Sequence, residues 1–599
     1  MRKRSKPTPL DSPKVDADAA QGGTSRRDFL AVSAAGLVAA AAPGMPTPSL
    51  LVGTSAKEIV RNLEPKRKLL KGGVVLTMEP TGDFEKADVL IEGKKIVDIG
   101  PNLHGGGEQI DCSGTIVMPG FISTHHHQYE TPARSVIPDG LLAGNWPQES
   151  YGSVVQNIWT AGRIGGAGGA FIWDIGRPPM DPEDVYLAEL VASLSQLTEG
   201  ITCAVDTSQA SHQPAYTDAM IQGLMDSGAR AVYDYSGGTN RSAQFPSQPY
   251  EYPGAIGNNT SGIGRIASTY FNSRDQLVTL AFAGGPGAAF AGAPYTGWQL
   301  GRAFGASINN HNVGSPSTVI SAAADPRNGT DWSDVTFVHC VRWQDLPLAQ
   351  ISHSDLGYPN PATSQAWNIW RDRGAHSSVA VIIEAQMRHG MPPFQQALNH
   401  GILPSLSPDV DTNFTTDPFS LMRGAFVLQR GLANDLAFPL SNPGNLPIPQ
   451  LVTSRQVIEM MTVAGAASAR LSDKVGTLKV GKEADIVVLD ARNINITPMN
   501  NVPGTIVTMM NARHVRDVFV AGNTVYTNGK LVGWDMKKLL RDLEKSHERI
   551  LARIRGPSLT GPLPPGNNST GGSSYRPNFL GSCCYNGQNT TAPHYVLRP

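Results

Sequence analysis

Short apolar runs bounded by polar turns recur at both ends of the chain. They occupy residues 74–78, 87–91 and 95–99 at one end, and 484–489, 515–521 and 523–526 at the other. Gly93 and its charged neighbours mark a hairpin turn between two of them. Runs of this length between turn residues are typical of β-strands. We therefore predict a β-sandwich domain built from both chain ends, residues 65–118 and 451–535.

Between these ends, residues 119–450 alternate between strand-like and helical patterns. Residues 185–197 have helical spacing and precede the apolar run 201–206, and helical residues 218–227 precede a further run at 229–233. Strand–helix alternation over this length favours a parallel α/β barrel. We predict the α/β class, with a (β/α)8 TIM-like barrel beside the composite β-sandwich.

Three segments lie outside these units. Residues 536–555 have helical spacing and mixed charge, which predicts a solvated surface helix. Residues 556–599 are rich in Pro, Gly, Asn and Ser, a composition typical of a disordered or extended arm. The first 50 residues form a leader.

The leader resembles a bacterial twin-arginine (Tat) export signal. Residues 24–30 read Thr-Ser-Arg-Arg-Asp-Phe-Leu and precede an alanine-rich apolar run at 31–42. That run is too short to span a bilayer as a mature helix. We predict recognition by the Tat export machinery, no membrane anchor, and a periplasmic or extracellular mature protein. The alternative is a disordered basic leader.

The composition of the chain argues against some classes of binding partner. The 599 residues are 40% hydrophobic and 17% charged, with a formal net charge of -1. This length is enough for a large core and more than one domain, and the charge gives no electrostatic case for nucleic acid. The five cysteines include no Cys-x-x-Cys pair, which argues against a thiolate zinc knuckle. Four tryptophans either line a substrate pocket or belong to the core: Trp332, Trp343, Trp367 and Trp370.

Residues 118–127, Met-Pro-Gly-Phe-Ile-Ser-Thr-His-His-His, carry the strongest chemical signal. On a strand, alternate side chains project to the same face, so His125 and His127 share a face and His126 projects to the other. One divalent ion can then bind both. The alternative is a polar loop or a surface patch that binds metal adventitiously.

Three later strand-like runs also end in a residue that can coordinate metal. These residues are His311, His339 and Asp409. In a parallel barrel the carboxyl ends of the strands form the active-site face. Three imidazoles and one carboxylate around an open position suit Zn or Fe(II).

With these motifs the chain resembles the amidohydrolase superfamily, in particular the mononuclear branch with cytosine deaminase and the triazine hydrolases. The matching segments are residues 119–127, 199–206, 338–340, 464–467 and 475–485. The resemblance implies a (β/α)8 barrel with a composite β-sandwich, and hydrolysis at carbon–nitrogen bonds. It also implies metal ligation by His125, His127, His311 and Asp409, with His339 as the histidine of the sixth barrel strand.

No lysine stands between Lys95 and Lys474. Binuclear relatives bridge two metal ions with a carboxylated lysine on a barrel strand, which this chain cannot supply. We therefore predict one divalent metal ion, zinc rather than iron, unless a Glu or Cys forms the bridge instead.

The implied mechanism is hydrolysis by metal-activated water. Asp409 would take the water proton and pass it to the leaving nitrogen, and His339 would hydrogen-bond the developing oxyanion. Deaminases of this branch usually carry Glu three residues after the strand-five histidine, where this chain has Gly314. Glu384 and His389 are the candidate catalytic replacements.

An alternative for Glu384 is a salt bridge to Arg388, four residues on. The missing acid makes ring deamination less certain than hydrolysis in general. We predict a metal-dependent hydrolase that cleaves a non-peptide carbon–nitrogen bond of a small, cyclic substrate. The alternatives are a dechlorinase or open-chain amide hydrolase on the same scaffold, and a catalytically inactive binding protein. Relatives often self-associate, which leaves both a monomer and a homo-oligomer open.

Overall fold

The computed structural model describes most of the predicted barrel and sheet. The described residues are 67–80, 82–135, 138, 180–211, 213–236, 262–284, 297–312, 316–340, 361–387, 389–437 and 451–554. The chain divides into two units, Met1–Asn62 and Leu63–Pro599, and every described residue belongs to the second. The predicted leader, the C-terminal arm from residue 556, Gly314 and Arg388 lie outside the described residues.

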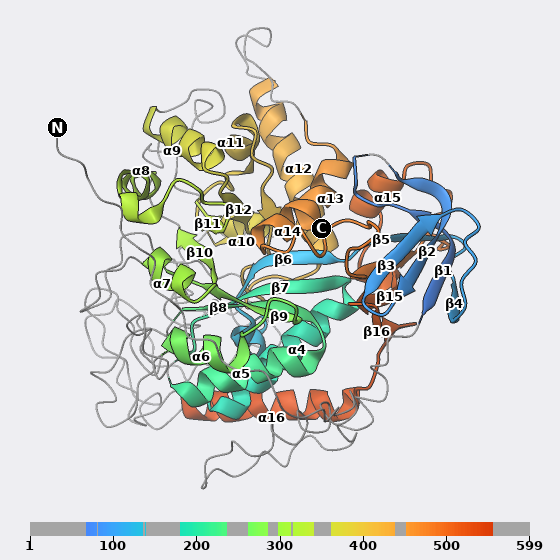
Figure 1. Ribbon diagram of the computed structural model, residues 1–599, viewed down its shortest axis with the longest axis horizontal. Helices are drawn as coiled ribbons and strands as arrows, with labels where there is room; N and C mark the ends of the chain where they lie inside the picture. Colours follow the sequence, from blue (N-terminus) through green and yellow to red (C-terminus); the bar gives the residue numbers. More distant parts are fainter. Residues whose placement is uncertain are drawn as a thin grey trace, which may run out of the picture. The chain divides into compact units, whose positions relative to one another are not determined.

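Eight parallel strands form the barrel, each hydrogen-bonded to the next in chain order (Figure 1). They are β6 (Phe121–His126), β7 (Ile201–Ser208), β8 (Arg230–Tyr235), β9 (Val278–Phe282), β10 (Ser307–Asn312), β11 (Val335–His339), β12 (His376–Val379) and β13 (Ser405–Leu406). Backbone hydrogen bonds between the ends of β13 and β6 nearly close the ring: His127 N donates to Asp409 O at 2.8 Å, and Asp409 N donates to His125 O at 3.2 Å.

Helices alternate with these strands, as the sequence predicts. They are α4 (Pro182–Thr198), α5 (Pro214–Ser227), α6 (Gly262–Tyr270), α7 (Gly297–Ala303), α8 (Ser317–Ala324), α9 (Pro361–Asp372), α10 (Val381–Gln386), α11 (Phe394–Asn399) and α12 (Pro418–Ala437). The local sequence explains the bounds of α5: Pro214 stands at its first turn, and Gly228 ends it with φ of 71°.

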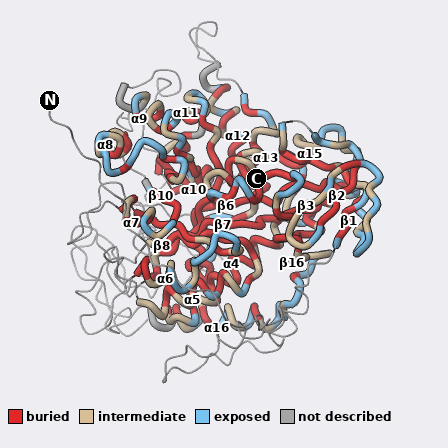
Figure 2. The backbone as a smooth tube through the Cα atoms, in the orientation of Figure 1, coloured by how far each residue is buried: buried red, intermediate tan, exposed pale blue. Residues whose placement is uncertain are grey.

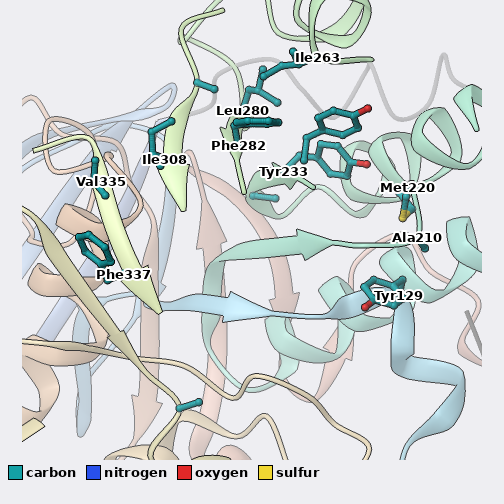
Figure 3. Close-up of a cluster of buried hydrophobic side chains, with 14 of the residues drawn as sticks. Tyr129, Ala210, Met220, Tyr233, Ile263, Leu280, Phe282, Ile308, Val335 and Phe337 are labelled. Atoms are coloured by element: carbon teal, nitrogen blue, oxygen red, sulfur yellow. The ribbon is translucent and has the colours of Figure 1, made fainter. Parts of the chain in front are cut away.

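A core of buried apolar side chains fills the space between the barrel strands and their helices. Figure 3 shows part of this core, with Tyr233, Leu280, Ile308 and Phe337 from the strands and Met220 from α5. Three of the four tryptophans considered above, Trp332, Trp367 and Trp370, are fully buried in this same core. They therefore stabilise the fold; Trp343 lies outside the described residues.

The second sheet joins the two chain ends. In sheet order its strands are β17 (Lys530–Leu531), β16 (Asn523–Thr527), β15 (Val515–Val520), β14 (Ile486–Asp490), β5 (Thr115–Pro119), β1 (Lys68–Val75), β2 (Phe84–Glu92) and β3 (Lys95–Gly100), with β4 (Glu108–Asp111) also paired to β1. All five residues of β5 pair with those of β14 in antiparallel register. The composite sheet predicted from both ends is thus confirmed.

Both faces of β14 are buried, which explains why its sequence is continuously apolar. Ile486 and Val488 lie in the core of the sheet domain, whereas Val487 and Leu489 lie in a second core with α4. Figure 2 shows the barrel strands β6 and β7 buried in the same way. A buried ion cluster also joins the barrel to the residues that precede β14. In it, Arg230 of β8 donates to Asp485 at 2.7 Å and to Glu483 at 2.7 Å.

Two helices follow the predicted domain boundary at residue 450. Helix α14 (Val463–Ser468) packs on barrel strands, whereas α13 (Ser454–Met461) shares one core with barrel strands and with strands β14 and β15 of the sheet domain. Ala466 and Val475 share a core with Ile122 and Val232 from the barrel strands. Gly465 lies so close that a Cβ there would come 2.9 Å from Ile122 Cβ. The small side chains of this segment therefore let it pack against the barrel interior, away from the carboxyl ends of the strands.

The predicted surface helix is present as α16 (Met536–Ile554), with one side buried against the barrel. Ser546 and Arg549 donate to Asp184 of α4 at 2.7 and 2.6 Å, and Ile550 is buried. Its partner elements are α4 and η1 (Gln128–Ala133), so the helix is only partly solvated. None of the helices in the described part of the chain combines the length and apolar character of a membrane span.

Candidate metal centre

The histidines of β6 divide between two faces, as strand geometry requires. His126 points toward the helix layer, where its Nδ1 lies 2.6 Å from Gln196 Nε2 of α4. His125 and His127 point into the barrel, with ring centres 4.7 Å apart. Burial lowers the pKa of His126 to about 4, so this imidazole is neutral at ordinary pH. His126 is therefore a buried structural residue on the far side of the strand.

The predicted ligands converge at the carboxyl ends of the barrel strands. His125 Nε2 and His127 Nε2 lie 3.1 and 3.4 Å from the same oxygen, Asp409 Oδ1. The ring of His311 is centred 4.8 Å from that of His125 and 5.6 Å from that of His127. His339 Nε2 lies 3.0 Å from His311 Nε2 and 3.7 Å from Asp409 Oδ2. Five residues separated by up to 284 positions thus form one cluster.

Donor atoms in this cluster lie within 4.8 Å of one another in three groups. The groups are His125, His127 and Asp409; His125, His311 and His339; and His339, His389 and Asp409. The nitrogen–oxygen spacings in the first group suit one ion with ligand bonds of ~2 Å. His311 lies at the exposed side of the cluster, whereas the other members are buried.

The outward-facing nitrogens of three of these histidines already have partners. His127 Nδ1 lies 3.1 Å from the carbonyl oxygen of Thr207, which can only accept, so Nδ1 carries the hydrogen. His125 Nδ1 lies 2.8 Å from the Thr207 hydroxyl, and His339 Nδ1 lies 3.0 Å from Glu384 Oε1. Partners of this kind orient imidazoles whose Nε2 binds metal.

The backbone is strained where two of the cluster residues stand. His339 and Asp409 have φ of 69° and 64°, in the left-handed region that residues with a side chain rarely adopt. Each such residue costs on the order of 1–3 kcal/mol and persists only where the surrounding structure holds it. For Asp409, the two backbone hydrogen bonds to His125 and His127 at the end of β6 keep the backbone in this conformation.

The electrostatics keep a charged carboxylate among the imidazoles. Burial alone would raise the pKa of Asp409, but His339 and His125 outweigh it and hold this pKa well below the usual range. Burial lowers the pKa of His125 to about 3. For His127, burial is outweighed by the hydrogen bond and charge of Asp409, so its pKa is raised. The negative carboxylate of Asp409 beside the neutral imidazole of His125 offers an anionic oxygen and a nitrogen lone pair to a divalent cation.

Glu384 and His389 both reach the cluster, but in different ways. Glu384 is fully buried in α10 and accepts from Ala380 N at 2.9 Å while contacting His339 Nδ1, so it lies behind that histidine. His389 is 5% exposed, and its ring centre lies 5.3 Å from that of His339. The suggested salt bridge from Glu384 to Arg388 lies outside the described residues.

Sequence reasoning missed Thr207, which contacts both β6 ligands, and the buried residues behind it. The signal was present: the apolar strand Ile201–Ser208 ends in the polar run Asp206, Thr207, Ser208. In a barrel, such a change at a strand's carboxyl end marks residues that face the site.

Comparison with known proteins supports this architecture. The sequence profile of the amidohydrolase family matches residues 352–526. The chain is 25% identical over 505 residues to 5'-deoxyadenosine deaminase of Methanosarcina mazei, covering 81% of this chain and 99% of the relative. It is 24% identical over 506 residues to 5-methylthioadenosine/S-adenosylhomocysteine deaminase of Pelotomaculum thermopropionicum, again covering 81% of this chain and 99% of the relative.

Solved structures agree on the fold. A mutant of atrazine chlorohydrolase TrzN from Arthrobacter aurescens, complexed with zinc and atraton, superposes with a TM-score of 0.62 at 18% identity, covering 80% of this chain and 100% of that one. An adenosine deaminase from Xanthomonas campestris with bound zinc superposes with a TM-score of 0.57 at 18% identity, covering 81% and 98%. The barrel, the composite sheet and the matched relatives agree with the resemblance of this chain to the amidohydrolase superfamily.

Proposed function

We propose that this protein is a zinc-dependent hydrolase that releases an amino group from a ring carbon of a small heterocyclic substrate. The observation that carries the proposal is the meeting of His125 Nε2 and His127 Nε2 at Asp409 Oδ1, with Thr207 accepting the Nδ1–H of His127. This geometry leaves a nitrogen lone pair directed inward beside an ionised oxygen.

The residues present fit one zinc ion. His125, His127, His311 and Asp409 would hold it, since imidazole and carboxylate are donors that zinc accepts in catalytic sites. The absence of lysine between Lys95 and Lys474 supports a single ion. Bound zinc would supply water activated for attack, by lowering its pKa from ~15.7 toward ~7.

The chain's own residues would then handle the protons. Asp409 Oδ2 accepts the proton of the attacking water, and His339 Nε2, 3.7 Å from that oxygen, hydrogen-bonds the developing oxyanion. Glu384 holds His339 in place through Nδ1. Asp409 passes this proton on through His389, whose donor atom lies within 4.8 Å of Asp409 and His339, and His389 donates it to the departing nitrogen, so the protonation of the protein is restored. The overall reaction takes one water and releases one ammonia, leaving a hydroxyl or its keto tautomer on the ring.

The relatives point to adenine nucleosides as the first substrates to test. Ammonia release is measured from 5'-deoxyadenosine, 5'-methylthioadenosine and S-adenosylhomocysteine, and then from cytosine, guanine, a pterin and an aminotriazine. We expect release from at least one of them with zinc-loaded protein and none after chelation. Zinc-loaded protein that releases no ammonia from any of them would contradict the deaminase proposal.

Hydrolysis of a carbon–chlorine bond is the second candidate. It is favoured by the structural likeness to the atrazine chlorohydrolase and by Gly314 at the position where deaminases usually carry Glu. Chloride release from atrazine, measured alongside ammonia, separates the two reactions.

The roles proposed for His389 and Glu384 predict different defects. His389→Gln should lower kcat by about 10²-fold, because a general acid contributes 10²–10⁴-fold. Glu384→Gln should lower kcat by about 10–100-fold through the orientation of His339. A substrate whose leaving group needs no protonation should restore most of the rate to His389→Gln but not to Glu384→Gln. Equal rescue of both variants would contradict this division of roles.

We further propose that the mature protein is exported by the Tat machinery and acts in the periplasm or outside the cell. The twin arginine of residues 26–27 before the apolar run supports this. Fractionation of cells carrying the wild-type chain and an Arg26→Lys, Arg27→Lys variant tests it. Self-association into a homo-oligomer is likewise a proposal, tested by light scattering.

A further inference from the structure

One residue contacts both imidazoles that β6 contributes to the candidate metal centre. Thr207 stands on β7, the neighbour of β6 in the barrel. His126 of β6 is paired with Asp206, the residue before Thr207. Its carbonyl oxygen lies 3.1 Å from His127 Nδ1, and its hydroxyl lies 2.8 Å from His125 Nδ1. The carbonyl settles the tautomer of His127, but a hydroxyl can donate or accept.

The contact of Thr207 with Asp234 shows to which partner the Thr207 hydroxyl donates its hydrogen. Thr207 Oγ1 donates to Asp234 Oδ2 at 3.0 Å, and the same carboxyl oxygen accepts from Asn309 Nδ2 at 2.9 Å. A hydroxyl has a single hydrogen, so the Thr207 oxygen is left to accept from His125 Nδ1. The hydrogen bonds therefore run from His125 through Thr207 to Asp234.

The register of the barrel strands brings the residues of this hydrogen-bond relay next to one another. Thr207 and Asp234 are paired neighbours on β7 and β8, and Ala281 of β9 is paired with Asp234. Asn309 of β10 reaches Asp234 across the intervening strand β9, on which Ala281 carries only a methyl group. Thr207, Asp234 and Asn309 are each no more than 4% exposed, so water does not compete for these bonds.

The relay does not depend on the charge of Asp234. Burial raises the pKa of this carboxyl to about 8, and the hydrogen bonds from Thr207 and Asn309 oppose the shift. The relay requires only an oxygen that accepts two hydrogen bonds. A carboxylate oxygen and the carbonyl oxygen of a protonated carboxyl both meet this need.

We propose that Thr207 and Asp234 are positioning residues of the metal centre, which hold His125 in the tautomer whose Nε2 can bind the ion. This inference rests on the proposed function for the identity of the ligands. Hydrogen bonds to the outer nitrogen of a ligand histidine typically change metal affinity or activity 10–100-fold.

Thr207→Val tests the relay, because valine keeps the shape and the backbone carbonyl but lacks the hydroxyl. We expect zinc affinity, measured by competition with a chelator, to fall about 10-fold or more. The visible spectrum of the cobalt-loaded variant should also change. Thr207→Ser keeps the hydroxyl and should restore both properties. If the valine variant does not fold, Thr207→Ala removes the same group and is judged by the same outcomes.

Thr336→Val is the matched control. Thr336 is also a buried barrel threonine, but its hydroxyl donates to Ser468 O at 2.9 Å, away from the ligands. Its zinc affinity should equal that of the wild type. Unchanged zinc affinity in the Thr207 variant, or an equal loss in the Thr336 variant, would overturn the relay. Failure of the wild-type protein to bind zinc would instead overturn the proposed function.

Discussion

Replacing His125 with alanine is expected to abolish metal binding and hydrolysis together. His125 is buried, its Nε2 lies 3.1 Å from Asp409 Oδ1, and its ring lies within 5.2 Å of those of His127, His311 and His339. Without the ion, the pKa of water returns from ~7 to ~15.7, so we expect kcat to fall by more than about 10³-fold. Elemental analysis should find zinc reduced from about one equivalent to a trace.

His126→Ala is the neighbouring control. This histidine is also fully buried, but its Nδ1 contacts Gln196 behind the strand. The variant should keep its zinc and lose only thermal stability, because a cavity opens between β6 and α4. A His126 variant without zinc, or a His125 variant with a full equivalent, would refute the assignment of the two faces. Two equivalents of zinc in the wild-type protein would reverse the lysine argument.

Replacing Asp409 with asparagine is expected to reduce kcat by about 10²–10⁴-fold at saturating zinc, the range that positioned general bases contribute. The amide oxygen can still face His125 and His127, but the side chain cannot take up a proton from water. The change should therefore affect kcat more than KM. Rates are measured on protein whose zinc content has been determined, so that loss of the ion is distinguished from loss of the base.

Asp411→Asn provides the comparison for this variant. Asp411 stands two residues further on and is also buried, but it accepts from Arg134 at 2.7 Å and Thr131 at 3.2 Å rather than facing the imidazoles. Its kcat should stay near the wild-type value. Similar losses at positions 409 and 411 would show that the loop as a whole, rather than the Asp409 carboxylate, limits the rate.

The ligand positions could be predicted from the sequence because they follow from local geometry. Strand alternation alone places His125 and His127 on one face and His126 on the other. The alternation of strands and helices predicts a parallel barrel, whose carboxyl ends bring His311, His339 and Asp409 to the same face. The apolar run at residues 484–489 likewise predicted a strand, although not that both of its faces would be buried.

The partners of these residues could not be read from the chain. Glu384 was a candidate acid or a helix salt bridge, and its contact with His339 depends on how α10 packs against β11. The sequence assigned the segment with Ala466 and Val475 to the sheet domain. In the structure both residues share a core with Ile122 of the barrel.

Periodicity along the chain thus settles which side of a strand or helix each residue occupies, since this depends only on backbone geometry. The hydrogen-bond partner of a buried side chain depends instead on strand register and helix packing between distant segments. Thr207 and Asp234 are 27 residues apart, and the pairing of β7 with β8 makes them neighbours. For that reason the candidate metal ligands of this protein are visible in its sequence, whereas the residues proposed to orient them appear only in the folded barrel.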